Sequence, residues 1–143
     1  MIFLKLLKIY YTNLNINSII SMSNAYYFCT NLTGSPVCGP NVTNMSSMFY
    51  DCLSLTEIKG LTTTTLNINF ITSSVTNMFC MFANCSKLEE LNVSNFDTSN
   101  VTNMNFMFSN CSSLTTLDLS GFDTSSVTTM YSMFNGCSGL TTL

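Results

Sequence analysis

The sequence contains no histidine, no arginine and no tryptophan, and charged residues make up only 8% of its 143 positions. Without histidine, a Ser-His-Asp triad, a Cys-His nucleophile pair and a histidine-ligated zinc site are excluded. Four lysines cannot line a basic surface that tracks phosphates, so we do not expect nucleic-acid binding. No apolar run reaches the roughly 18 residues of a membrane span, so we expect no such span.

Small uncharged polar residues fill most of the positions that charged residues would otherwise take. The chain contains 20 threonines, 20 serines and 18 asparagines. These side chains form local hydrogen bonds in turns and at chain reversals. The sequence therefore predicts a neutral surface that is rich in hydroxyl and amide groups. The length suits one domain.

One motif occurs five times along the chain. Each copy has a Met followed seven residues later by a Cys, with an aliphatic residue three positions before the Met and a Leu three positions after the Cys. The five motif methionines are Met22, Met45, Met78, Met104 and Met130. Their spacings of 23, 33, 26 and 26 residues predict an array of stacked repeats, which we call rungs.

The spacing within one rung predicts its secondary structure. The apolar residues recur at the spacing of one face of an amphipathic helix, and in the fourth rung they are Val101, Met104, Met107, Phe108 and Cys111. Leu117 and Leu119 then alternate around Asp118, as in a short strand. We therefore expect an α/β repeat solenoid, leucine-rich-repeat-like and right-handed, with one helix and one short parallel strand per rung.

The repeat also divides the chain. We expect five rungs near 19–41, 42–74, 75–100, 101–126 and 127–143, preceded by a degenerate rung or cap over 1–18. The third strand is expected at 66–68, after a threonine-rich insertion. The last rung stops at Leu143, inside its expected strand, so we expect a truncated chain that could self-associate through its C-terminal rung.

The stretch "NVTNMNFMFSNCSSLTTLDLSGFDTS" resembles the repeats of BspA-like leucine-rich-repeat surface proteins, and more narrowly their mycoplasma-lipoprotein-type branch. The resemblance runs from Ile19 to Leu143 and is close over 75–143. It implies a leucine-rich-repeat-like fold in a cell-surface or secreted protein that serves adhesion or host interaction. It implies no catalytic residues.

The five motif cysteines could bind a metal, form disulfides or pack as small apolar residues. They are Cys29, Cys52, Cys85, Cys111 and Cys137. No C-x-x-C pair is present, which disfavours zinc, so we interpret them as a buried structural ladder without a metal. Cys38 and Cys80 lie outside the ladder, and the total of seven excludes complete pairing within the chain.

Two other residue types could suggest metal sites. The paired methionines of the last four copies of the motif could bind copper, but their spacing with Phe favours core packing. Asp97 and Asp123 recur at one position of the rung and could bind calcium. Each is a single carboxylate beside Thr and Ser, which favours capping of a helix start. We expect no cofactor and no metal.

The sequence favours a non-enzymatic module that binds a protein or glycan partner through the face of the strands. Side chains that flank the inward leucines should point outward, and they are the candidate binding residues: Asn67, Glu90, Asn92, Thr116 and Asp118. Glu89 and Glu90 are adjacent and make a poor acid–base pair. The alternative is a structural spacer in a long surface stalk. A contiguous exposed groove with aromatic residues would favour binding, and a uniformly polar Thr/Ser surface would favour the spacer.

Overall fold

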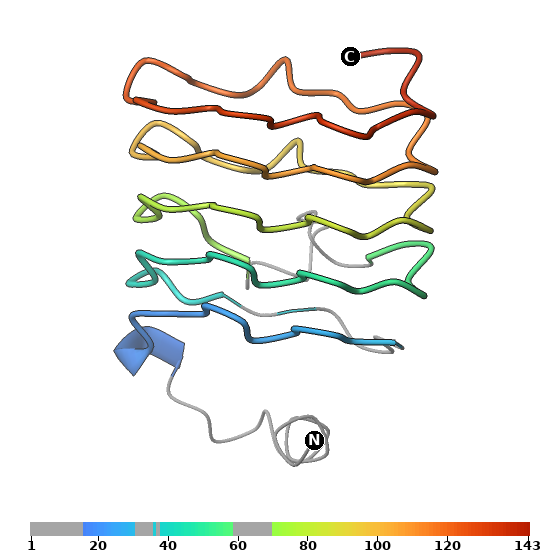
Figure 1. Ribbon diagram of the computed structural model, residues 1–143. Coiled ribbons are helices and arrows are strands. Elements are labelled where there is room, and N and C mark those ends of the chain that lie inside the picture. The colour runs from blue at the N-terminus through green and yellow to red at the C-terminus, as the bar shows by residue number, and fades with distance from the viewer. Residues whose placement is uncertain (1–15, 31–35, 37, 59–69) are drawn as a thin grey trace.

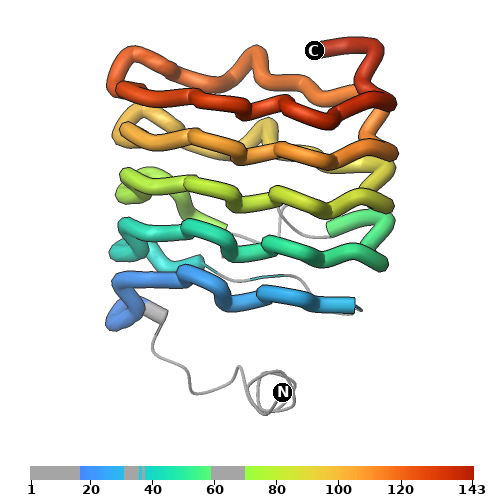
Figure 2. The backbone as a smooth tube through the Cα atoms, viewed as in Figure 1, coloured from blue at the N-terminus to red at the C-terminus, as the bar shows by residue number. Residues whose placement is uncertain are grey.

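The chain winds into coils that stack one above the next, from the N-terminal end to the C-terminal end (Figure 1). This computed structural model describes residues 16–30, 36, 38–58 and 70–143. Figure 2 shows that each rung is flattened, so that two long sides enclose a narrow interior. The expected cap over 1–18 and the expected strand at 66–68 lie outside the described residues, apart from 16–18.

The prediction of one helix and one short strand per rung is wrong. Within the described ranges the one helix is η1, a 3-10 turn at Ile16–Ser18. Strand pairing is present there only as isolated parallel bridges. They are Ser21↔Asn44, Cys38↔Phe70, Asn44↔Asn77, Glu57↔Glu90, Asn77↔Asn103, Asn103↔Thr129 and Thr116↔Thr142. The chain is therefore not an α/β solenoid.

Overlapping turns replace the expected helix. In the fourth rung, the N–H of Met107 donates to the Met104 carbonyl at 3.2 Å, and the N–H of Cys111 donates to the Phe108 carbonyl at 3.1 Å. The third residue of each turn is left-handed, with φ of 56° at Phe106 and 59° at Asn110. An α-helix needs right-handed residues throughout, so a left-handed residue every four positions prevents it.

The same pair of left-handed positions recurs in all five rungs, two and six residues after the motif Met. The residues are Asn24 and Phe28, Ser47 and Asp51, Cys80 and Asn84, Phe106 and Asn110, and Ser132 and Gly136. The second position carries Asp, Asn or Gly in four rungs, and these residues tolerate left-handed backbone best. The repeated turn is thus encoded at this position.

Main-chain hydrogen bonds between rungs hold the turns in register. In the third rung the N–H groups of Met78, Cys80, Phe82 and Asn84 donate to carbonyls of the fourth rung at 2.7–2.9 Å. The N–H groups between them donate backward within their own rung, as Met81 does to Met78. Alternate N–H groups therefore bond between rungs and within a rung, which satisfies the backbone without a helix.

Polar side chains complete the hydrogen bonding at the start of each turn segment. The amide oxygen of Asn103 accepts the N–H of Asn105 at 3.0 Å, and Asn44 and Asn77 do the same in their rungs. One residue earlier, the Thr102 hydroxyl donates to the Thr76 carbonyl at 3.1 Å. Thr128 repeats this bond to Thr102 at 2.9 Å. The abundance of Thr and Asn therefore has a structural use on the outside of the coil.

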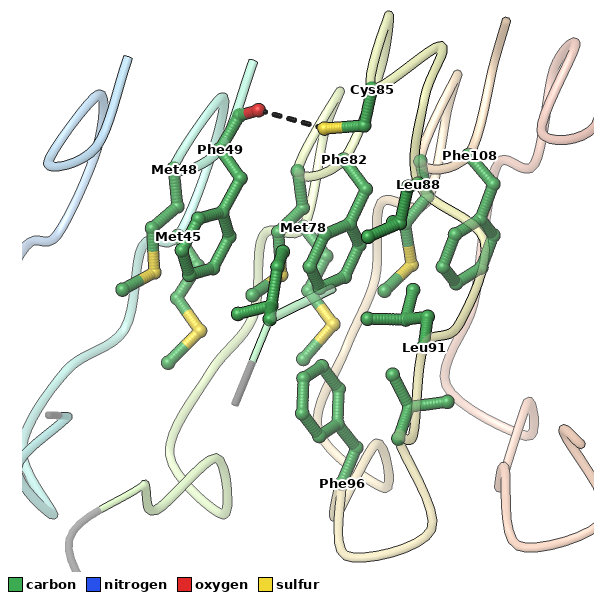
Figure 3. Close-up of a cluster of buried hydrophobic side chains, with 14 of the residues drawn as sticks. Met45, Met48, Phe49, Met78, Phe82, Cys85, Leu88, Leu91, Phe96 and Phe108 are labelled. Carbon is green, nitrogen blue, oxygen red and sulfur yellow. Dashed lines mark hydrogen bonds between the residues drawn. The ribbon is translucent and has the colours of Figure 1, made fainter. Parts of the chain in front are cut away.

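The interior is filled by columns of equivalent side chains (Figure 3). One column is a stack of five rings, with successive centroids 5.1 to 5.7 Å apart and planes within 8° of parallel: Tyr26, Phe49, Phe82, Phe108 and Phe134. Paired methionines lie beside it, and leucines enter from the other side of the coil. Phe96 links the two sides, since its ring lies 6.4 Å from that of Phe82.

The motif cysteines form a column of free thiols. Four are buried and Cys137 is half-buried. Each thiol from the second rung onward donates to a carbonyl of the preceding rung, as Cys85 does to Phe49 at 3.1 Å (Figure 3). The equivalent bonds of Cys52, Cys111 and Cys137 span 3.0–3.2 Å. The thiols thus bridge rungs in the way a main-chain donor would.

Burial makes three of these thiols, Cys85, Cys111 and Cys137, weaker acids. It raises the pKa of Cys111 from 9.0 to about 12, and the charge of a neighbouring Cys137 thiolate adds to this rise. The pKa of Cys85 is also raised, first by its hydrogen bond with Cys52 and then by burial. The pKa of Cys52 is lowered instead, first by its hydrogen bond with Cys85. A thiol is a nucleophile only as the thiolate, so the raised pKa values of Cys85 and Cys111 keep these two thiols unreactive at neutral pH.

The ring stack predicts that damage in one rung spreads to its neighbours. Phe108→Ala should lower the free energy of unfolding by about 3–5 kcal/mol, because it leaves a cavity between two stacked rings. Hydrogen exchange should accelerate in the segments 78–85 and 130–137 as well as in 104–111. Phe108→Leu is the control and should cost less. Faster exchange confined to 101–119 would contradict shared packing between rungs.

The buried thiols predict a stability loss at alkaline pH. The folded-state pKa of Cys111 is raised, so its contribution is complete below about pH 9 and falls as the pH rises towards 12. Between pH 8 and pH 11 the wild type should therefore lose more unfolding free energy than Cys111→Ala, measured by urea denaturation. Iodoacetamide should label the column only after denaturation. Rapid labelling of all five thiols in the native protein would refute their burial.

Candidate binding face

The outer side of the overlapping turns forms a wall that we call the turn face. It consists of 19–29, 42–52, 75–85, 101–111 and 127–137, and its one charged residue is Asp51. Inward positions on this wall are fixed by the motif, whereas the positions one and two residues after the motif Met vary between rungs and are at least partly exposed in every rung except at the buried Cys80. The variable positions are therefore where the turn face can differ chemically from a plain Ser/Thr/Asn surface.

Three aromatic side chains occupy these variable positions in successive rungs. Phe79, Phe106 and Tyr131 form a continuous cluster, which we call the aromatic strip. The ring centroids of Phe79 and Phe106 lie 6.0 Å apart, and those of Phe106 and Tyr131 lie 5.3 Å apart, both edge to face. Phe79 and Phe106 are partly exposed, and Tyr131 is 68% exposed. The strip lies outside the core cluster.

Asn105 places polar groups within the aromatic strip. It occupies the fourth rung at the position that Phe79 and Tyr131 occupy in the third and fifth rungs. Its Oδ1 accepts the Thr129 hydroxyl at 2.5 Å and the Tyr131 N–H at 2.6 Å. These two bonds fix the amide, and its NH₂ group donates to no residue among those described. A pair of hydrogen-bond donors therefore lies beside apolar rings.

A second aromatic group lies on the turn face in the first two rungs. The rings of Tyr27 and Tyr50 stack at 5.2 Å and 7°. Phe28 meets Tyr27 edge to face at 4.4 Å and is 53% exposed. This group is close to Asp51, whose carboxylate accepts the Asn84 amide at 2.7 Å. It is therefore separate in both position and polarity from the aromatic strip.

Four of the five sequence-predicted binding residues lie on the other side of the coil. Glu90, Asn92, Thr116 and Asp118 are exposed, and they flank the buried Leu91, Val93 and Leu117. Glu90 and Thr116 take part in parallel bridges to the neighbouring rungs, so this side also aligns equivalent residues. Asn67 lies outside the described residues. Among the described residues, no exposed aromatic cluster lies beside these four, since Phe70 and Phe96 are buried and Phe122 is partly buried.

Two of the predicted binding residues already have local hydrogen-bond partners. The Asp118 carboxylate accepts the N–H of Ser120 at 2.9 Å, and bonds from Ser120 lower the pKa of that carboxyl. Asn92 accepts the N–H of Ser94 at 3.0 Å in the same way. Both side chains stabilise a turn, and this reduces their freedom to reorganise around a ligand.

The recurring aspartates cap turns and not helices. Asp97 accepts the N–H and the hydroxyl of Ser99, and Asp123 accepts the N–H of Ser125 at 2.8 Å. Hydrogen bonds from Ser125 lower the pKa of Asp123. The expectation of a helix start at these residues is wrong, because the next segment is a series of turns. Among the described residues, no three Cys, Asp or Glu side chains gather into a metal-binding group.

Sequence reasoning missed the aromatic strip because it assigned these rungs to helices. The signal was nevertheless present. At the position of Phe79 and Tyr131 the first two rungs carry serine, and at the position of Phe106 two other rungs carry serine. An aromatic residue that replaces serine at an outward position of a repeat is unrelated to packing. Comparison of rungs position by position would have identified all three residues.

Comparison with known proteins places the chain in a family. Residues 5–60 and 43–142 match the family model described as "Mycoplasma protein of unknown function, DUF285". No curated protein and no solved structure matches the chain. The described residues include no helix with the length and apolarity that crossing a bilayer requires. Since the match spans most of its length, the chain belongs to the DUF285 family.

Proposed function

We propose that the chain is a non-enzymatic interaction module that binds a partner through the aromatic strip. The observation that carries this proposal is the partly exposed cluster of Phe79, Phe106 and Tyr131 on the third to fifth rungs, where the remaining outward residues of the turn face are mainly Ser, Thr and Asn. Aromatic side chains bury a large area at a low entropic cost, and for this reason they are enriched at binding surfaces. A spacer would have no use for them at outward positions.

The location at the cell surface or outside the cell is part of the same proposal. Its support is the resemblance of the repeats to BspA-like surface proteins, together with the membership of the DUF285 family. The turn face carries one charged residue, and this also suits a partner that is recognised by shape and hydrogen bonds.

A second candidate interaction is head-to-tail self-association. In the fifth rung the N–H groups of Met130, Ser132, Phe134 and Gly136 donate to no described residue, although their equivalents in the other rungs all donate forward. In the first rung the matching carbonyls of 21, 23, 25 and 27 accept no bond from the described chain. These donors and carbonyls are in the same register, and this supports pairing of the fifth rung of one copy with the first rung of another.

The binding proposal predicts that one triple variant removes recognition and leaves the fold intact. Phe79→Ser, Phe106→Ser and Tyr131→Ser each introduce a residue that another rung carries at the same position. The wild type should bind ligands on protein and glycan arrays, and the triple variant should lose that binding by about tenfold or more with an unchanged melting temperature. Phe28→Asn, which removes an exposed ring elsewhere on the turn face, is the control. Equal binding by wild type and triple variant would support the spacer.

The self-association proposal predicts concentration-dependent sedimentation of the 143-residue chain. Met130 and Leu143 are 49% and 66% exposed at the fifth rung, so Met130→Lys with Leu143→Lys adds charge there without opening the core. The double variant should sediment as a monomer at concentrations where the wild type associates, because stacked copies would bury both lysines. A wild type that stays monomeric throughout would disprove the proposal.

A further inference from the structure

We propose that the aromatic strip binds an uncharged oligosaccharide. The inference rests on the proposed function, since it names the chemical class of the partner for the same surface. The occupant is a neutral chain of pyranose rings, lying across the third, fourth and fifth rungs over Phe79, Phe106 and Tyr131.

The absence of charge is the first argument for this partner. Across 75–85, 101–111 and 127–137 the turn face carries no acidic or basic residue. Nucleic acids, sulfated or sialylated glycans and charged peptides all gain affinity from opposite charges that this surface does not offer. A neutral sugar loses nothing by the lack of them.

The mixture of groups on the strip is the second argument. A pyranose ring has apolar faces of C–H groups, and these pack on aromatic rings whose faces are electron-rich. Its edges carry hydroxyl groups that both donate and accept hydrogen bonds. The strip offers rings from three rungs, and between them lies the fixed NH₂ group of Asn105, whose oxygen is already held by Thr129 and the Tyr131 N–H.

Exposed threonines supply the matching acceptors. The hydroxyls of Thr102 and Thr128 donate to carbonyls of the preceding rung at 3.1 and 2.9 Å, so their hydrogens point into the wall. Both side chains are exposed, and the oxygen of each retains lone pairs towards solvent. Asn105 and Tyr131 lie three positions after Thr102 and Thr128 in the sequence. Donors, apolar platforms and acceptors therefore follow one another along the turn face.

The partner lies across rungs in this arrangement because the rings do so. Phe79, Phe106 and Tyr131 come from consecutive rungs and contact one another edge to face. The platform is thus elongated along the stack, and it matches an extended oligosaccharide better than a single sugar. Binding of hexasaccharides should accordingly be stronger than binding of the corresponding monosaccharides.

Calorimetric titration with defined sugars tests this inference. The probes are maltohexaose, cellohexaose, xylohexaose and chitohexaose, with a heparin-derived hexasaccharide as the charged comparison. We expect at least one neutral hexasaccharide to bind and the heparin fragment not to bind. Tyr131→Ser and Phe106→Ser should each weaken the neutral ligand about tenfold, and Asn105→Ala should weaken it as well. Phe28→Asn should leave the affinity unchanged.

The possible failures are distinguishable. If the wild type binds none of the four neutral sugars, or binds the heparin fragment with similar affinity, the glycan inference is overturned. If an array protein binds the wild type and the serine variants lose that binding, the proposed function still holds. If the serine variants keep both protein binding and sugar binding, the proposed function and the glycan inference are both overturned. Circular dichroism of each variant, with an unchanged melting temperature, excludes unfolding as the cause.

Discussion

The alternation of main-chain hydrogen bonds is the constraint on which the rest of the structure depends. N–H groups at the motif Met and at every second residue after it bond to the next rung, and the N–H groups between them close turns within the rung. This alternation fixes the register of each rung on the next. It also fixes which side chains point inward, because the left-handed residues recur at the same two positions. No rung satisfies its own backbone alone, so the rungs are stable only together.

Exact register turns each motif position into a column through the stack. A Phe therefore meets an aromatic ring above and below it at about the distance preferred by offset rings, as Phe82 does with Phe49 and Phe108. In the cysteine column, each thiol from the second rung onward donates to a carbonyl of the preceding rung, as Cys111 does to Phe82. On the surface, the hydroxyl of Thr102 donates to the Thr76 carbonyl of the preceding rung in the same way. The repeat in the sequence thus follows from the main-chain hydrogen bonds between rungs. They hold equivalent positions against one another, so each side chain must pack against its equivalents in the neighbouring rungs.

The sequence predicted the rungs and the inward residues but not the backbone. Turns with a period of four and an α-helix both direct positions i, i+3, i+4 and i+7 to one side, so Met104, Met107, Phe108 and Cys111 could not distinguish them. The evidence against a helix was at Asn110, where the equivalent residue is Asp, Asn or Gly in four rungs, since a helix has no need of such residues there. The exposure of Asn92 and Thr116 followed from the alternation around buried leucines. The strip was missed because its residues depart from the repeat.

That departure explains why the proposed recognition site is confined to a few positions of so regular a chain. Inward residues, left-handed residues and the Thr and Asn columns are all constrained by neighbouring rungs, so a change in any of them disturbs two interfaces. The side chains of Phe79, Phe106 and Tyr131 are less constrained, since serine occupies the same sites elsewhere, although the backbone of Phe106 is one of the left-handed residues. A ring at these sites adds exposed apolar surface and contributes nothing to the hydrogen bonds between rungs. Its cost to solubility is offset when a partner covers it, and three adjacent rungs give that partner one continuous platform.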